Sequence, residues 1–249
     1  MDLSAVTALI LAGGLGTRLR PIVPDGPKAL APLQGRPFLE YQVEWLARQG
    51  VRRIVLCLGH ANQAIIDHFG DGARFGVAIR ASVEPLPLGT AGALALVRDL
   101  VTTTAVAMNG DTFYADDLRP MLAQHRATGA AMTIGAGAGD GRAGGQMVTD
   151  AARRVTRFAE KSEVIPAAWV SAGLYLLEPA VLAAIPAGRA VSLERETIPA
   201  LLVAGLPVYV YPLQHGFWDM GTPEGYARLA NHISTMRLPA DDTSGMGAP

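Results

Sequence analysis

The stretch "VTALILAGGLGTRLRP", residues 6–21, joins an apolar run to a turn that is rich in glycine and arginine. The apolar, partly β-branched run is typical of a buried strand, and the glycines that follow allow backbone conformations that other residues avoid. Backbone N–H groups without a neighbouring Cβ can approach an anion, and an arginine guanidinium binds phosphate oxygens in pairs. The stretch therefore predicts a strand that ends in a phosphate-binding turn.

Similar apolar runs alternate with helical patterns along the first half of the chain. Strands are predicted at 6–12, 52–59, 76–82 and 103–111, and helices at 38–50, 61–70, 90–100 and 117–129. Gly50 and Gly70 stand where helices are expected to end. This alternation favours an α/β fold with a Rossmann-like, doubly wound, mostly parallel sheet. Ligands are then expected beyond the carboxyl ends of the strands.

The second half of the chain has a different pattern, which begins at a glycine-dense loop around residue 137. Short antiparallel strands are predicted at 146–150, 153–162 and 169–178, followed by a helix at 192–205, a strand at 206–213 and a last helix at 221–233. Thr222 and Pro223 suit the start of that last helix. We interpret residues 1–237 as a single domain, with a nucleotide-binding part (about 1–136), an annex (about 137–221) and a C-terminal helix (about 222–235). The composition of residues 238–249 predicts a disordered tail.

Composition and charge exclude several classes of protein. Of the 249 residues, 50% are hydrophobic and 17% are charged, which is typical of a compact globular protein. A net charge of −1 argues against nucleic acid or an anionic membrane as a partner, because both require a basic surface. The single cysteine, Cys57, excludes an intrachain disulfide and a site of clustered thiolates. The amino terminus has no basic region before its short apolar run, so we expect a cytoplasmic protein.

Seven blocks follow one another between residues 6 and 233: LILAGGLGTRLRP, GPKALAPLQGRPFLEY, EPLPLGTAGAL, NGD, FAEK, SAGLYLL and GFWDMGTPEGY. Together they resemble the sugar-1-phosphate nucleotidyltransferases, and most closely the D-glycero-α-D-manno-heptose 1-phosphate guanylyltransferases. The resemblance implies a nucleotide-diphospho-sugar transferase fold in which the small antiparallel annex completes the sugar site. It also implies that a sugar 1-phosphate oxygen attacks the α-phosphorus of a nucleoside triphosphate and expels pyrophosphate.

The resemblance also assigns the catalytic groups. It implies that Arg18 faces the leaving phosphates, that Lys28 neutralises charge around the reacting phosphates, and that Asp111 and Asp219 together hold Mg²⁺. Without the family pattern, a turn aspartate is an equally good interpretation of Asp111. The residues expected around the nucleotide are Leu11, Ala12, Gly13, Gly14, Gly16, Thr17 and Arg18 of the first loop, Gly89, Thr90 and Ala91 at a helix start, and Asn109 and Gly110 of NGD.

Glu84 bears on the choice of base. A carboxylate accepts two hydrogen bonds, and guanine offers two adjacent donors, N1–H and the exocyclic amine, whereas uracil and thymine offer one. Glu84 therefore favours GTP, and an exposed loop glutamate is the alternative interpretation. Ala29 stands where some thymidylyltransferases of the family have a glutamine that touches the base, so that contact is absent here.

On the sugar side, the resemblance implies that Glu160 of FAEK contacts sugar hydroxyls and that Lys161 contacts the sugar phosphate. Gly173 would let the sugar approach the backbone, and Glu194 is a further candidate for hydroxyl contacts. An arginine–glutamate surface patch is the alternative interpretation of Glu194.

The function predicted from these blocks is a Mg²⁺-dependent condensation of GTP with D-glycero-α-D-manno-heptose 1-phosphate to GDP-heptose. Alternatives in the family are a mannose-1-phosphate guanylyltransferase and a hexose-1-phosphate nucleotidyltransferase that uses UTP, dTTP or CTP. A non-catalytic sugar-nucleotide-binding subunit could lack Arg18, Lys28 or the two aspartates, all of which are present. A nicotinamide-dependent oxidoreductase is disfavoured because Leu19 replaces the third glycine of its fingerprint. The family often forms homo-oligomers, and we expect no hexapeptide-repeat acyltransferase after the last helix.

Overall fold

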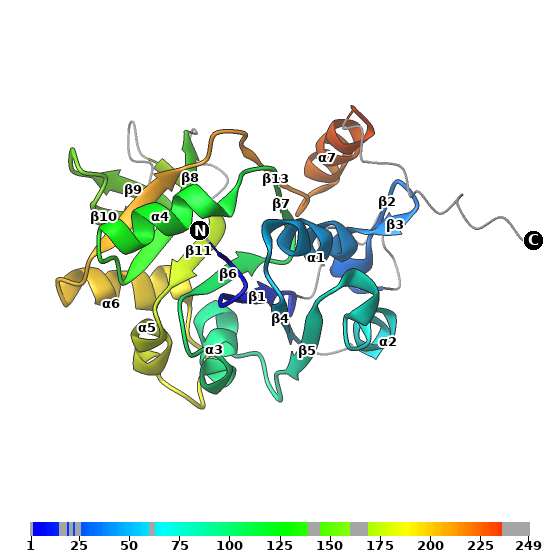
Figure 1. Ribbon diagram of the computed structural model, residues 1–249, viewed down its shortest axis with the longest axis horizontal. Coiled ribbons are helices and arrows are strands. Elements are labelled where there is room, and N and C mark those ends of the chain that lie inside the picture. The colour runs from blue at the N-terminus through cyan, green and yellow to red at the C-terminus, as the bar shows by residue number, and fades with distance from the viewer. Residues whose placement is uncertain are drawn as a thin grey trace, which may run out of the picture.

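The computed structural model describes residues 2–14, 19, 22, 26–59, 63–138, 145–159 and 169–235. These residues form a central sheet that has helices packed on both of its faces (Figure 1). Within the described part of the chain, no helix combines the length and the apolar character that are needed to cross a membrane.

The sheet has nine strands among the described residues. Its main path runs through β10 (Val155–Ala159), β9 (Gln146–Thr149), β11 (Trp169–Leu177), β6 (Ala105–Asn109), β1 (Thr7–Leu11), β4 (Arg53–Leu58) and β5 (Ala78–Val83). β8 (Met132–Ala138) pairs with β11 and with β12 (Val208–Pro212). β6, β1, β4 and β5 are parallel, whereas β11 and β9 pair in antiparallel fashion. The predicted α/β fold with a Rossmann-like, mostly parallel sheet is confirmed.

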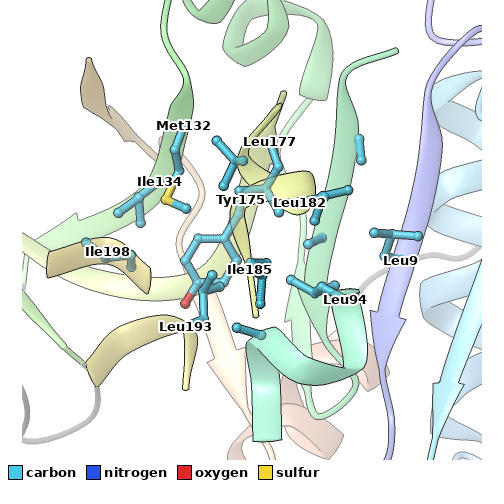
Figure 2. Packing of buried hydrophobic residues seen from close by; sticks show 14 of the residues in the cluster. Leu9, Leu94, Met132, Ile134, Tyr175, Leu177, Leu182, Ile185, Leu193 and Ile198 are labelled. Atoms are coloured by element: carbon cyan, nitrogen blue, oxygen red, sulfur yellow. The ribbon is translucent and has the colours of Figure 1, made fainter. Parts of the chain in front are cut away.

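Helices cover both faces of the sheet. One face carries α1 (Phe38–Gln49), α2 (Gln63–Phe69) and α4 (Leu118–Ala127), and the other carries α3 (Gly89–Leu96), α5 (Pro179–Ala184) and α6 (Ile198–Val203). Successive side chains of a strand point to opposite faces. Leu9 of β1 therefore belongs to the core beneath α3, α5 and α6, whereas Ala8 and Ile10 belong to the core on the other face. Figure 2 shows the first of these cores, in which Tyr175 of β11 packs among the aliphatic side chains.

Glycine and threonine form the helix ends that the sequence predicts. Gly50 follows α1 in the left-handed region with a φ of 96°, and Gly70 follows α2 with a φ of 53°. At the start of α7 (Pro223–Thr235), the Thr222 hydroxyl accepts a hydrogen bond from the Gly225 N–H over 3.1 Å. These helix boundaries are confirmed.

Some segments differ from the prediction. β8 continues into the segment predicted as a glycine-dense loop, because β11 and β12 pair with it on either side. The helix predicted at 192–205 begins as a π-helical turn, η5 (Leu193–Thr197). Several short elements were not predicted, because they have too few residues to show a periodic pattern. They are the helical turns η2 (Lys28–Leu30), η3 (Ala73–Phe75) and η4 (Arg98–Leu100). They also include the ladder of β2 (Pro32–Leu33) with β3 (Arg36–Pro37) and that of β7 (Thr112–Tyr114) with β13 (Phe217–Asp219).

α7 packs on the β7–β13 ladder and completes a third, smaller core with the start of α1 (Figure 1). Phe113, Met220 and Leu229 are buried in it. The ring of Trp218 stacks on His232 of α7, with 3.7 Å between the ring centroids and 19° between the planes. This packing fixes β13, and therefore Asp219 at its end, against β7.

Candidate functional site

A cavity of about 770 Å³ opens at the carboxyl ends of β1, β4, β5 and β6. Its volume is typical of a small-molecule site, and its position is the one at which parallel α/β sheets bind ligands. The described residues that line it are Leu11, Ala12, Gly13, Gly14, Lys28, Ala29, Cys57, Gly59, Glu84, Pro85, Leu86, Pro87, Gly89, Thr90, Ala93, Asn109, Gly110, Asp111 and Gly221. The described residues that the sequence analysis assigns to the nucleotide all line this cavity, with the exception of Ala91.

The turn after β1 lies directly against the end of β4. A Cβ on Gly59 would overlap the Gly13 carbonyl oxygen, and a Cβ on Gly13 would come within 3.0 Å of the Gly59 nitrogen. Gly59 therefore requires glycine, whereas a side chain at position 13 would require the Gly59 backbone to shift by a few tenths of an ångström. Gly59 was not predicted as a site residue. The available signal was its place at the end of an apolar strand, where α/β sheets bind ligands.

Lys28 and Asp111 form an ion pair at the edge of the cavity. The Lys28 Nζ donates to Asp111 Oδ2 over 2.6 Å, and the two side chains are 13% and 30% exposed. Because both groups are partly shielded from water, their attraction is stronger than that of a pair on the open surface. η2 carries Lys28, and the buried Ala29 beside it anchors this turn in the core.

Asp219 lies close to Asp111 in the fold, although the two are 108 positions apart in the chain. Asp219 pairs with Thr112 in the β7–β13 ladder, and the Met220 N–H donates to the Asp111 carbonyl over 2.9 Å. Asp219 Oδ1 accepts from the N–H of Gly221, which lines the cavity, over 2.6 Å. The fold therefore brings these two predicted metal ligands to neighbouring backbone positions, which the sequence alone could not show.

Glu84 and Cys57 line the side of the cavity that β4 and β5 form. Glu84 Oε2 accepts the Leu88 N–H over 2.7 Å, which holds the carboxylate in a fixed position. Burial, assisted by the nearby Glu84 charge, raises the pKa of the Cys57 thiol to about 12. The thiol therefore stays protonated at neutral pH and is a poor nucleophile.

The start of α3 is tied to the annex. Gly89 and Thr90 line the cavity, whereas Ala91 is fully buried. The N–H groups of Ala91 and Gly92 both donate to the Val191 carbonyl, over 3.0 and 3.2 Å. These two N–H groups at the start of α3 therefore already have a hydrogen-bond acceptor within the protein.

Glu194, a predicted sugar contact, binds three hydroxyl groups of the protein. Its carboxylate accepts hydrogen bonds from Thr90 at 3.0 Å, Tyr175 at 3.1 Å and Ser192 at 3.2 Å. Figure 2 shows the Tyr175 hydroxyl directed out of the core toward the segment of Leu193. Glu194 therefore connects the cavity wall at the start of α3 with β11. Its direct contact with a sugar stays a prediction.

Gly173 lies beneath the cavity wall rather than in it. It has a φ of +70°, and a Cβ on it would overlap the side chain of Asn109, which lines the cavity. The Tyr114 hydroxyl donates to the Gly173 carbonyl over 2.9 Å. Glycine at position 173 thus leaves room for the Asn109 side chain. This reason for glycine was not predicted from the sequence. Its contact with a sugar stays a prediction.

Several predicted residues lie outside the described part of the chain. They are Gly16, Thr17 and Arg18 of the first loop, Glu160 and Lys161 of FAEK, and the tail 238–249.

Comparison with known proteins identifies relatives of this chain. Residues 7–235 match the family described as Nucleotidyl transferase. The chain is 40% identical to the mannose-1-phosphate guanylyltransferase of Mycobacterium tuberculosis, over 90% of this chain and 63% of that protein. It is 35% identical to mannose-1-phosphate guanylyltransferase 1 of Arabidopsis thaliana, over 96% of this chain and 68% of that protein. The chain thus covers less than two thirds of the mycobacterial relative.

Solved structures share the fold. HddC from Yersinia pseudotuberculosis, complexed with GMP-PN, superposes with a TM-score of 0.78 at 26% identity, over 92% of this chain and 99% of that chain. A Bacillus anthracis protein in complex with a sucrose reaches a TM-score of 0.84 at 23% identity, over 94% of this chain and 97% of that chain. The second likeness concerns the fold alone.

The contact between Gly173 and Asn109 predicts an unequal cost for two glycine substitutions. Gly205 also has a φ of +70°, but no atom lies within 4 Å of the Cβ position there. Gly173→Ala and Gly205→Ala should share a backbone cost of about 1–3 kcal/mol in the free energy of unfolding. Gly173→Ala should lose more, because it also displaces Asn109. Urea unfolding of both variants tests this, and equal losses would show that Asn109 gives way without cost.

Proposed function

Because this chain belongs to the nucleotidyl transferase family, we propose that it transfers a guanylyl group from GTP to a sugar 1-phosphate of manno configuration and releases pyrophosphate. The observation that carries this proposal is the Lys28–Asp111 pair at the edge of a cavity where β1 and β6 end. The names of the relatives, which include mannose-1-phosphate guanylyltransferases, support guanylyl transfer. The GMP-PN in the HddC complex supports a guanine nucleotide.

The proposed reaction requires the alignment of anions. A sugar phosphate oxygen forms a bond to the α-phosphorus, and the bond from that phosphorus to the oxygen of the leaving pyrophosphate breaks. The nucleophile is already charged, so no side chain has to remove a proton from it. The protonated Cys57 thiol is consistent with a site that needs no protein nucleophile. Catalysis then depends on position and on charge stabilisation.

Lys28 is the proposed cation at the reacting phosphates. Its amine is held in place by Asp111, on the rim of the cavity that would receive them. The backbone of Gly13 and Gly14, also on the cavity wall, is proposed to approach the triphosphate. By the family pattern, Gly16, Thr17 and Arg18 would complete this loop, with Arg18 at the leaving pyrophosphate.

A divalent cation fits the charges of the described cavity wall. Glu84 and Asp111 contribute two carboxylates to it and Lys28 one ammonium, so a triphosphate would need further positive charge. Asp111 and Asp219 offer hard carboxylate oxygens at adjacent backbone positions, which suits Mg²⁺. When bound, Mg²⁺ supplies neutralisation of the phosphate oxygens. We therefore propose Asp111 and Asp219 as its protein ligands.

Glu84 is the proposed guanine contact. The Leu88 N–H holds one of its oxygens, so the carboxylate keeps one orientation at the cavity wall. A carboxylate oxygen accepts more than one hydrogen bond, which leaves capacity for the N1–H and the amine of guanine. Gly89 and Thr90 are proposed to lie along the base or the ribose.

Two sugars of manno configuration are candidates. Mannose 1-phosphate is favoured by the 40% identity to a mannose-1-phosphate guanylyltransferase. D-glycero-α-D-manno-heptose 1-phosphate is favoured by the resemblance of the seven blocks to heptose 1-phosphate guanylyltransferases. The two sugars differ only at the far end of the ring substituent. Glu160 and Lys161 are proposed, on the family pattern, to contact the sugar hydroxyls and phosphate.

A pyrophosphate-release screen tests the proposed reaction. It crosses GTP, UTP, dTTP, CTP and ATP with mannose, D-glycero-D-manno-heptose and glucose 1-phosphates in the presence of Mg²⁺. We expect GTP and a manno-configured sugar to give the highest kcat/KM. Glu84→Gln should lower the preference for GTP over UTP by about 10- to 100-fold, because one strong acceptor of the guanine edge is lost.

Three results of that screen would contradict the proposal. Higher turnover with UTP or dTTP would reject guanylyl transfer, and a preference for glucose would reject the manno configuration. Binding of sugar nucleotides without pyrophosphate release from any pair would indicate a non-catalytic subunit.

Removal of a proposed metal ligand should abolish turnover without unfolding the protein. We expect Asp111→Asn to lower kcat by at least about 100-fold, because it removes a charge that both Mg²⁺ and Lys28 would contact. Asp117→Asn is the matched control, since this carboxylate caps α4 and pairs with Arg119 outside the cavity, and asparagine keeps the cap. Steady-state kinetics with both variants provides the test. Near-normal turnover of Asp111→Asn would remove Asp111 from the metal site.

A further inference from the structure

Gln42, in the middle of α1, holds the turn that carries Asp111. Its Nε2 donates to the Asn109 carbonyl over 2.8 Å and to the Thr112 carbonyl over 2.7 Å. The residue is 1% exposed. One buried amide thus binds the backbone on both sides of Gly110 and Asp111.

The same turn is held from two other directions. The Gly110 N–H donates to the Leu11 carbonyl at the end of β1, and the Met220 N–H donates to the Asp111 carbonyl, each over 2.9 Å. Those two contacts come from backbone, which any sequence can supply. Gln42 adds a side chain that reaches the turn from the helix layer. Its removal would leave the Asn109 and Thr112 carbonyls without these donors.

The polarity of the Gln42 site explains why an amide stands there. The Gln42 Oε1 is buried and meets no donor among the described residues. Burying this oxygen without a donor costs free energy, which an apolar side chain of the same length would avoid. Packing alone therefore does not account for glutamine at this position. A rotated amide would direct Oε1 at two carbonyl oxygens, so the two carbonyls determine its orientation.

We propose that Gln42 is a positioning residue for the nucleotidyl transfer. By binding both ends of the turn, it fixes the direction in which the Asp111 carboxylate meets Lys28 and the divalent cation. Groups that orient a metal ligand often matter nearly as much as the ligand itself. The inference rests on the proposed function only for its catalytic consequence, because the fixed turn can be measured without turnover.

Gln42→Met tests the proposal, and Gln49→Met is its control. Gln49 lies about two turns further along α1. It also bridges to backbone, with Nε2 donating to the Asp116 carbonyl over 3.1 Å and Oε1 accepting the Leu118 N–H over 3.2 Å. Each variant removes one amide bridge from the same helix, but only Gln42 touches the Asp111 turn.

We expect Gln42→Met to lower kcat by about 10- to 100-fold while each KM changes by less than about threefold. Manganese binding in the presence of GTP, followed by electron paramagnetic resonance, should weaken by about tenfold. Hydrogen exchange at the Gly110 and Met220 N–H groups should become faster. Gln49→Met should change none of these quantities by more than about twofold, even where it lowers stability.

Unchanged kcat, manganese affinity and exchange in Gln42→Met would overturn the inference, and so would equal losses in Gln49→Met. If Gln42→Met does not fold, Gln42→Asn provides the same comparison, because its shorter amide keeps the polarity but cannot span both carbonyls. An inactive wild type would refute the proposed function, whereas the exchange measurements would still decide whether Gln42 fixes the turn.

Discussion

The pairing of Asp219 with Thr112 joins the two halves of the candidate site. It is one step of a ladder in which β7 and β13 have only three residues each. Through this pairing, β13 lies against the turn after β6, which Lys28, Leu11 and Gln42 also contact. A ladder this short has little stability of its own, so it depends on what packs against it.

The support comes from α7 and from the third core. Trp218 stacks on His232, and Phe113 and Met220 are buried beside Leu229 of the same helix. The position of Asp219 therefore depends on residues that are not among those lining the cavity. The annex is joined to the start of α3 in a comparable way, since Glu194 accepts hydrogen bonds from Thr90 and from Tyr175. The positions of Asp219 and Glu194 thus both depend on contacts between segments that are distant in the chain.

The sequence predicted the elements whose side chains follow a clear period. The strands at β1, β4, β5 and β6 and the helix starting at Pro223 are where the pattern indicated. Asn109 and Glu84 line the cavity at the ends of two of those strands. They were predicted from the NGD block and from the two hydrogen bonds that a carboxylate can accept from guanine. Resemblance to a family added Lys28, Asp111 and Asp219, which spacing alone could not connect.

What the sequence could not show was the neighbours that each residue acquires. The glycines of β8 lie in a strand because β11 and β12 pair with it, although local preference indicates a loop. Gly59 matters because it meets Gly13, and Gly173 because it meets Asn109. Gln42 looks like one polar position in an amphipathic helix until the fold brings two carbonyls to its amide. All of these are long-range contacts, which leave no local pattern.

We propose that the turn after β6 and the end of β13 form one cation site at the cavity. Anomalous diffraction from crystals grown with Mn²⁺ and a non-hydrolysable GTP analogue measures this directly. We expect a manganese peak within coordination distance of the carboxylates of Asp111 and Asp219 and of the nucleotide phosphates. A nucleotide bound in the cavity with its manganese on other residues would contradict it.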